Sequence, residues 1–172
     1  TTVPYNAIPM DTSTAEATNT AYAQYNGGIQ QAFAALVNAG LISQANADAE
    51  IANRTISFTA GQNALVILDE SLTDLTNINP ALISMRQATN RDLIPLTTSG
   101  VIGTLADPNN PASVIGVGVP LNDGQVLTAS EYASVENART QYNSIINSIA
   151  SSYDNVIVAD MANGLSRLNS SG

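Results

Sequence analysis

The sequence predicts an α/β fold, and the stretch 126–161 indicates it most clearly. Apolar residues recur there at the three- and four-residue steps of one helix face: Tyr132, Val135, Tyr142, Ile145 and Ile149. The run 156–159 that follows is short, apolar and β-branched, as strands buried on both faces are. We therefore predict a helix over 129–152 and a strand over 156–161, which together form half of a βαβ unit of a parallel sheet.

Composition limits what the chain can do. Its 172 residues carry 14 acidic side chains, five Arg and no Lys, for a net charge of −9. This balance argues against binding to nucleic acid or to an anionic membrane surface. No Cys or His is present, so disulfides, thiolate chemistry and the usual general base near neutral pH are excluded. We expect no metal and no cofactor. We also expect no transmembrane segment, because no apolar run approaches about 20 residues.

The N-terminal region predicts two helices. The first follows Pro9, with Ser13 and Glu16 spaced as a capping box. The pair Gly27-Gly28 weakens its middle, which predicts a kink or a close packing contact. Gly40 is a natural stop, and Ser43 can cap a short second helix. The chain begins at Thr1 without Met or a signal peptide, which indicates a processed protein or a piece of a longer one.

Short apolar runs predict the remaining strands. The runs 55–58 and 64–68 flank a loop that contains Gly61, which predicts a β-hairpin. Residues 93–97 have strand character, although Pro95 cannot donate to a ladder. A short helix is predicted after the strand 156–161. The first 90 or so residues look less regular than the rest.

The segment Asp69-Glu70-Ser71-Leu72-Thr73 is the strongest candidate for chemistry. It is similar to the Gly-Asp-Ser-Leu serine block of one esterase superfamily, but Asp69 and Glu70 replace the Gly and the Asp. A serine hydroxyl without a partner base is a poor nucleophile, and the chain has no His for Ser71. The segment is therefore interpreted as an acidic loop.

Other candidate residues have an ordinary structural reading. Asp69, Glu70 and Asp74 carry the oxygen ligands of a hard cation, but their spacing fits no EF-hand loop, and solvated acids are the favoured reading. Asp160 follows the predicted strand, where α/β proteins bind ligands, and it equally fits a cap of the next helix. Two glycosylation sequons begin at Asn53 and Asn169, and such triplets arise by chance in an Asn-rich chain.

Five runs of the chain resemble SGNH/GDSL-type hydrolases of Bacteroidetes, many of them predicted lipoproteins. They preserve the order of the family and are spread along nearly the whole chain: TTVPYNAIP (1–9), ISFTAGQNALVILDESLTDL (56–75), MRQATNRDLIPLTTSGVIGT (85–104), DPNNPASVIGVGVPL (107–121) and VLTASEYASVENARTQYNSIINSIA (126–150). The resemblance implies part of a three-layer, flavodoxin-like α/β/α sandwich. It also implies that 1–91 is an inserted, cap-like region with helices and a hairpin, and that 92–172 is the α/β region.

The family hydrolyses esters with a serine nucleophile, an oxyanion hole and a late Asp-x-x-His. None of these blocks matches a residue of this chain, so the resemblance assigns no catalytic, cofactor-binding or metal-binding residue. The implied function is a segment of an esterase, inactive alone, from a cell-envelope or extracellular protein. Its partners would be the parent's ester substrate, other fragments of the precursor or a second copy. The alternative is a self-standing, non-catalytic surface module for a glycan or a protein partner.

Overall fold

The computed structural model describes the backbone of residues 2–171 and the side chains up to residue 168. The chain forms two compact units, Thr1–Ser130 and Glu131–Gly172, which we call unit 1 and unit 2. Helices and short antiparallel strands make up the fold, so the broad prediction of mixed α and β structure is confirmed. The named strands of the described chain form three two-stranded sheets and no parallel three-layer sheet.

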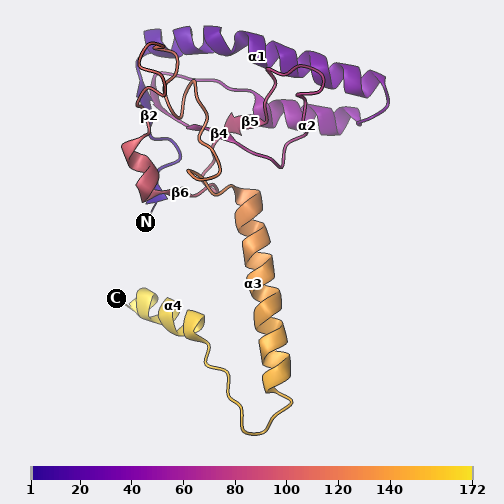
Figure 1. Ribbon diagram of the computed structural model, residues 1–172, viewed down its shortest axis with the longest axis vertical. Coiled ribbons are helices and arrows are strands. Elements are labelled where there is room, and N and C mark those ends of the chain that lie inside the picture. The colour runs from indigo at the N-terminus through magenta and orange to yellow at the C-terminus, as the bar shows by residue number, and fades with distance from the viewer. Residues whose placement is uncertain (1, 172) are drawn as a thin grey trace. The chain divides into compact units, whose positions relative to one another are not determined.

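Two helices lie side by side in unit 1, α1 (Thr12–Asn38) and α2 (Gln44–Arg54) (Figure 1). The N-cap of α1 is Asp11, whose Oδ1 accepts from the Thr14 N–H at 2.7 Å, and the predicted capping box at Ser13 is wrong. The carboxylate reaches the free N–H groups of the first turn and adds a negative charge there, which a Ser hydroxyl does not. Gly40 has a φ of 69° and ends the helix, and Ser43 caps α2 as predicted.

The glycine pair of α1 makes a close packing contact inside a continuous helix. A Cβ on Gly28 would lie 2.9 Å from Leu82 Cδ2, whereas one on Gly27 would meet nothing within 4 Å. Of the two predicted outcomes, the close contact is the one that the structure contains. It seats the loop around Leu82 on the middle of α1.

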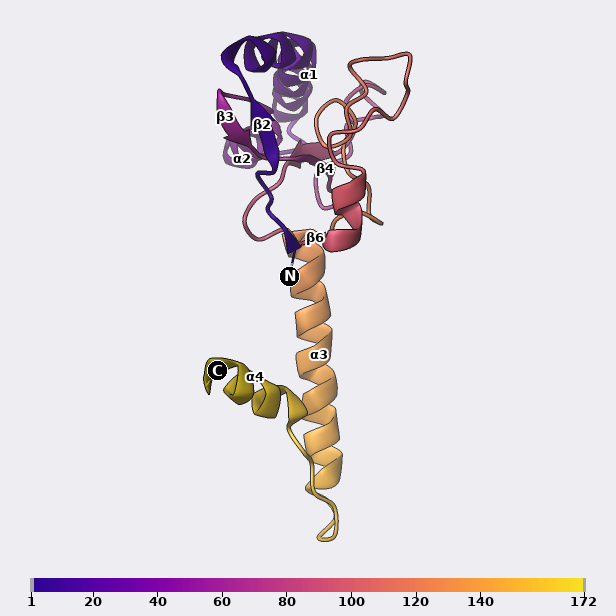
Figure 2. The same ribbon diagram turned by 90° about the vertical axis from the view of Figure 1, so that its left-hand side faces the viewer.

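The strands pair across long stretches of sequence, as Figure 2 shows for β2 and β3. The three antiparallel pairs are β1 (Thr2–Val3) with β6 (Ile94–Pro95), β2 (Ile8–Met10) with β3 (Gly61–Asn63), and β4 (Val66–Leu68) with β5 (Met85–Gln87). The predicted hairpin is therefore wrong, because its two arms pair with other segments or with none. The predicted strand 93–97 shortens to β6, and a 3₁₀ turn, η1 (Leu96–Gly100), follows Pro95.

Two Asn side chains of α1 take the place of a strand partner for residues 55–58. Asn26 accepts from the Ile56 N–H at 3.0 Å and donates to the Ile56 carbonyl at 2.9 Å. Asn19 does the same with Phe58, at 2.8 and 2.9 Å. Asn19 and Asn26 lie seven residues apart on one helix face, and their amides satisfy alternate residues of an extended chain. This segment is thus held by side chains where the sequence predicted a ladder.

One hydrophobic core fills unit 1. Fully buried members come from both sides of residue 91, with Ile29 and Phe33 of α1, Leu65, Ile94 and Leu121 at 0% exposure. Unit 1 therefore continues past the predicted end of the insertion, and the boundary at residue 91 stays a prediction.

Unit 2 contains a long helix, α3 (Ala129–Ala150), and a short helix, α4 (Met161–Ser171). The first two residues of α3 belong to unit 1. The predicted helix 129–152 is confirmed, and so is the short helix after residue 160. The predicted strand 156–161 is absent, and Ile157 is 94% exposed. A strand requires the backbone of a neighbour, and the described residues provide none for this run.

Candidate functional site

The serine of the acidic loop is bound into a turn. Ser71 donates its hydroxyl to Asp69 Oδ1 at 2.5 Å, and its N–H donates to the same oxygen at 2.9 Å. Asp69 Oδ2 accepts from Arg86 Nε at 2.6 Å. Burial raises the pKa of Asp69, but hydrogen bonds from Ser71 and Arg86 outweigh it and leave the pKa lowered. A carboxylate held this way is a weak base, so the geometry makes Ser71 part of a turn and gives it no activating group.

Arg86 links two aspartates in the interior of unit 1. Its guanidinium pairs with Asp92 through two bonds of 2.8 Å, in addition to the bond to Asp69. The Asp92 side chain is fully buried, and it also accepts from the N–H groups of Thr89 and Ala129 at 2.7 and 2.9 Å. Burial raises the pKa of Asp92, yet these bonds together lower it to about 2. Hydrogen bonds and charge interactions with Asp92 and Asp69 raise the pKa of Arg86 against the effect of burial. This network joins β4 and β5 to the start of α3.

Arg54 is a buried cation that the sequence reasoning did not single out. It is 0% exposed, pairs with Glu50 at 3.1 Å, donates to the carbonyl of Thr73 and lies 5.7 Å from the centre of the Phe33 ring. Its Nη1 has no hydrogen-bond partner among the described residues. The signal was present in the sequence, because Glu50 and Arg54 are four residues apart on one helix. Arg54 ties α2 to the loop after the acidic segment.

The remaining acidic candidates do not converge. Glu70 is exposed, and Asp74 accepts from the N–H and hydroxyl of Thr76. Within residues 2–168, no three Asp or Glu side chains are placed to hold a metal ion together. Asp160 Oδ1 accepts from the Asn163 N–H at 2.9 Å, directly before α4, which fits the cap reading.

The glycosylation sequons and the exposed Arg91 add no site. Asn53 is exposed on α2, Arg91 is exposed in a turn after β5, and the side chain of Asn169 lies outside the described residues.

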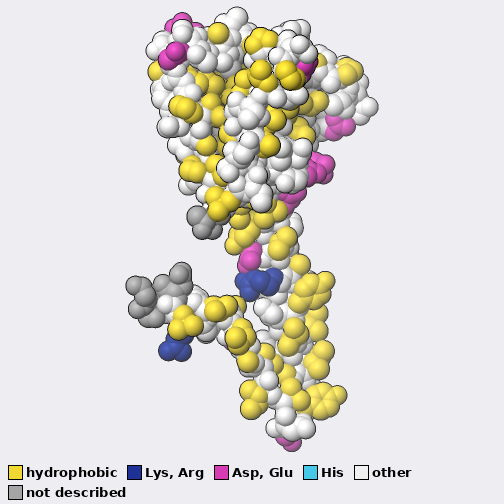
Figure 3. All heavy atoms as spheres, turned by 60° about the vertical axis from the view of Figure 1, so that its left-hand side comes forward, with side chains coloured by type: hydrophobic (Ala, Val, Ile, Leu, Met, Phe, Trp, Pro, Cys, Tyr) yellow, Lys and Arg dark blue, Asp and Glu magenta, His cyan; other side chains and the backbone are white. Residues whose placement is uncertain are grey.

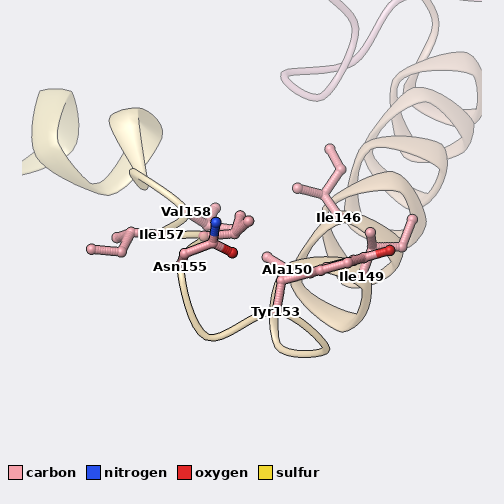
Figure 4. Close-up of a pocket in the computed structure, with 8 residues that line it drawn as sticks. Ile146, Ile149, Ala150, Tyr153, Asn155, Ile157 and Val158 are labelled. Carbon is pink, nitrogen blue, oxygen red and sulfur yellow. The ribbon is translucent and has the colours of Figure 1, made fainter.

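Two hollows have the dimensions of ligand sites. The unit 1 groove, of about 770 Å³, lies between β2, the first half of α1 and the loop 103–118. The unit 2 hollow, of about 610 Å³, lies between the end of α3 and residues 155–158. Figure 4 shows Ile146, Ile149 and Tyr153 on one side of the unit 2 hollow and Ile157 and Val158 on the other. The sequence patterns predicted neither hollow. The unit 1 groove is lined by segments that lie far apart in the sequence, and the apolar residues that line the unit 2 hollow were assigned to a helix and a strand.

Apolar side chains cover much of the surface of unit 2. Figure 3 shows them along α3 and onward toward α4. The most exposed include Tyr142 (67%), Ile149 (58%), Ile157 (94%) and Met161 (68%). None of the helices in the described part of the chain combines the length and the apolar character of a membrane span. Comparisons with protein-family models, curated proteins and solved structures found no match to the chain.

Proposed function

We propose that the chain is a segment of an SGNH/GDSL-type serine ester hydrolase of the Bacteroidetes lipoprotein type, and that it is inactive alone. The observation that carries the proposal is the resemblance of the five runs, which keep the family's order over nearly the whole chain. The residues that would attack the ester, stabilise the oxyanion and supply the base belong to other parts of the parent protein. Its location would then be the cell envelope or the extracellular space.

The apolar face of unit 2 supports this proposal. Side chains on the apolar face predicted for α3 are exposed, with Val135 at 57% and Ile145 at 55%. The β-branched run after α3 is extended and unpaired, with Val156 and Ile157 at 48% and 94% exposure. Surfaces of this kind mark contacts with something else, since monomeric proteins rarely expose large apolar patches. A parallel sheet of the parent protein, with 156–161 as one strand and α3 covering its face, would bury both.

The compact core of unit 1 supports an insertion that shapes the substrate side of the parent enzyme. Its residues close around Ile29, Phe33 and Leu121, so an inserted body of this kind would extend past the predicted boundary at residue 91. Such a body can be carried between two strands of a sheet, provided that its ends lie at the surface.

The test compares the chain with its parent reading frame. We expect a Gly-Asp-Ser block upstream and an Asp-x-x-His downstream. The parent protein should hydrolyse p-nitrophenyl acetate and butyrate, and the isolated chain should not. Substitution of the upstream serine should abolish the activity, and Ser71→Ala should leave it unchanged. A parent frame without these blocks would overturn the proposal. Turnover by the isolated chain that disappears in Ser71→Ala would do so as well, and would make Ser71 a nucleophile.

A second candidate, a non-catalytic binding module, is favoured by one observation. Unit 1 closes its own core, as a self-standing module for a glycan or protein partner would. Sedimentation at several concentrations separates the two. A compact monomer of 17.8 kDa with no second polypeptide would favour the module. Self-association, or capture of a complementary fragment of the parent, would favour the incomplete sheet.

A further inference from the structure

The walls of the unit 1 groove are tied together by hydrogen bonds. The Tyr22 hydroxyl of α1 donates to the Val117 carbonyl at 2.5 Å and fixes the helix to the loop 103–118. Ser113, which is 6% exposed, closes the loop, since its hydroxyl accepts from the Asp107 N–H at 2.9 Å and donates to the Asn110 carbonyl at 2.7 Å. Gly118 packs so tightly that a Cβ would lie 1.9 Å from the Ala112 carbonyl oxygen. A groove built this way is preformed, so ligand binding costs little conformational entropy of the protein.

The chemistry of the groove favours an uncharged, aliphatic ligand. None of its lining residues is charged, although the protein has a net charge of −9. Most of the lining is apolar, and hydroxyl groups come from Ser13, Thr14, Thr18 and Tyr22. An anion would find no counter-charge there, and a cation would leave water without a partner. Small residues on one face of α1, Ala17 and Ala21, leave depth along the helix, and Ile8 and Val117 form apolar walls. The volume of about 770 Å³ lies in the range of small-molecule sites and is too small for a folded partner.

We propose that the unit 1 groove binds the acyl chain of an uncharged ester. The ester class rests on the proposed function, whereas the aliphatic and uncharged character rests on the lining alone. The groove then selects substrates by their chain, and the parent's catalytic residues act on the ester group outside it.

The test uses the whole 172-residue chain and methyl octanoate as the probe. Alanine-methyl NMR resonances report the site, because Ala17, Ala21 and Ala112 line the groove while Ala133 and Ala138 lie on α3. We expect saturable shifts at Ala17, Ala21 and Ala112. Ala21→Phe fills the groove and should weaken binding by at least about tenfold. Ala23→Phe, at an exposed alanine of α1 that does not line the groove, is the matched control and should change binding less than about twofold.

Four outcomes would overturn the proposal. Three concern the unsubstituted chain: saturable shifts with maltotriose and none with methyl octanoate, shifts confined to Ala133 and Ala138, and the absence of saturable shifts. Equal weakening by Ala21→Phe and Ala23→Phe would also overturn it. Because the readout is binding to a chain expected to be inactive, these results leave the esterase proposal standing. A parent frame without catalytic blocks removes the ester assignment and leaves the measured groove binding intact.

Discussion

At the scale of single residues, Asp92 joins three segments of unit 1. It pairs with Arg86 of β5, accepts from Thr89 in the following turn, and accepts from Ala129 at the start of α3. A carboxylate with this many donors is stabilised in its charged form, although burial alone would favour the neutral form. Unit 1 therefore depends on Asp92 being ionised.

The stability of unit 1 should fall at low pH through this residue. The folded pKa of Asp92 is about 2, below the ordinary value of 3.8, so its contribution is present above about pH 4 and is lost as the pH falls toward 2. Because the side chain is fully buried, this shift corresponds to about 2 kcal/mol. Urea unfolding between pH 7 and pH 2 measures it. Asp92→Asn should be less stable at pH 7 and lose less stability across this range.

The control is Asp123→Asn, at an exposed position in a turn, which should follow the unsubstituted chain at every pH. Parallel pH profiles for the Asp92→Asn and Asp123→Asn chains would contradict the role given to Asp92. Ionic strength should change the profile little, because salt screens buried pairs much less than exposed ones.

At the scale of elements, α1 carries two adjacent glycines in different surroundings. Gly27→Ala meets open space and should stabilise unit 1 by about 0.5–1 kcal/mol through helix propensity alone. Gly28→Ala requires the end of the Leu82 side chain to move from 2.9 Å and should gain clearly less or lose stability. Thermal and urea unfolding of the two variants checks the difference. An equal gain in both would mean that Leu82 does not seat on the helix.

Helices were predictable here because their signals are local. Pro9 and Gly40 marked the limits of α1, the spacing of apolar residues located α3, and Ser43 located the start of α2. The strands were not, since each pairs with a segment far away: β2 near residue 9 pairs with β3 near residue 62, and β1 pairs with β6. The pattern around residues 55–58 indicates an extended chain, but nothing in it shows that its partners are the side chains of Asn19 and Asn26.

The candidate site was likewise predictable only where the signal is local in the sequence. The sequence showed that Ser71 has no histidine, and the structure adds a turn that uses its hydroxyl. The joining of Asp69, Arg86 and Asp92 needed the pairing of β4 with β5, which no local pattern encodes. The groove of unit 1 needed three segments from three parts of the chain.

At the scale of the whole molecule, apolar residues divide between a closed core and an open face. Ile29 is 0% exposed in unit 1, whereas Ile145 of α3 is 55% exposed. Ile29→Ala should cost about 2–5 kcal/mol of unfolding free energy, and Ile145→Ala less than about 1 kcal/mol in this chain. Urea unfolding followed by tyrosine fluorescence measures both. A large cost for Ile145→Ala would show that α3 packs on a partner, as the proposed parent sheet requires.

Limited proteolysis should distinguish the two units, because the chain offers trypsin five Arg residues and no Lys. Arg54 is fully buried and the Arg86 side chain is 11% exposed, whereas that of Arg139 on α3 is 52% exposed. Cleavage follows local opening, which is easiest where few tertiary contacts hold a segment. Mass spectrometry should show cuts at Arg139 before any at Arg54 or Arg86. Early cleavage at Arg54 would mean that unit 1 opens first.

The pairing of Asn26 with Ile56 has a consequence for the durability of the molecule. Asn26 precedes Gly27, a sequence in which the backbone nitrogen readily attacks the side-chain amide carbon and releases ammonia. In the folded chain the helix fixes that nitrogen, and the amide is held by Ile56. Once unfolded, the same residue can turn into an aspartate, which has no N–H to return to the Ile56 carbonyl. Every unfolding event that opens α1 therefore risks a permanent loss of the pairing between Asn26 and Ile56.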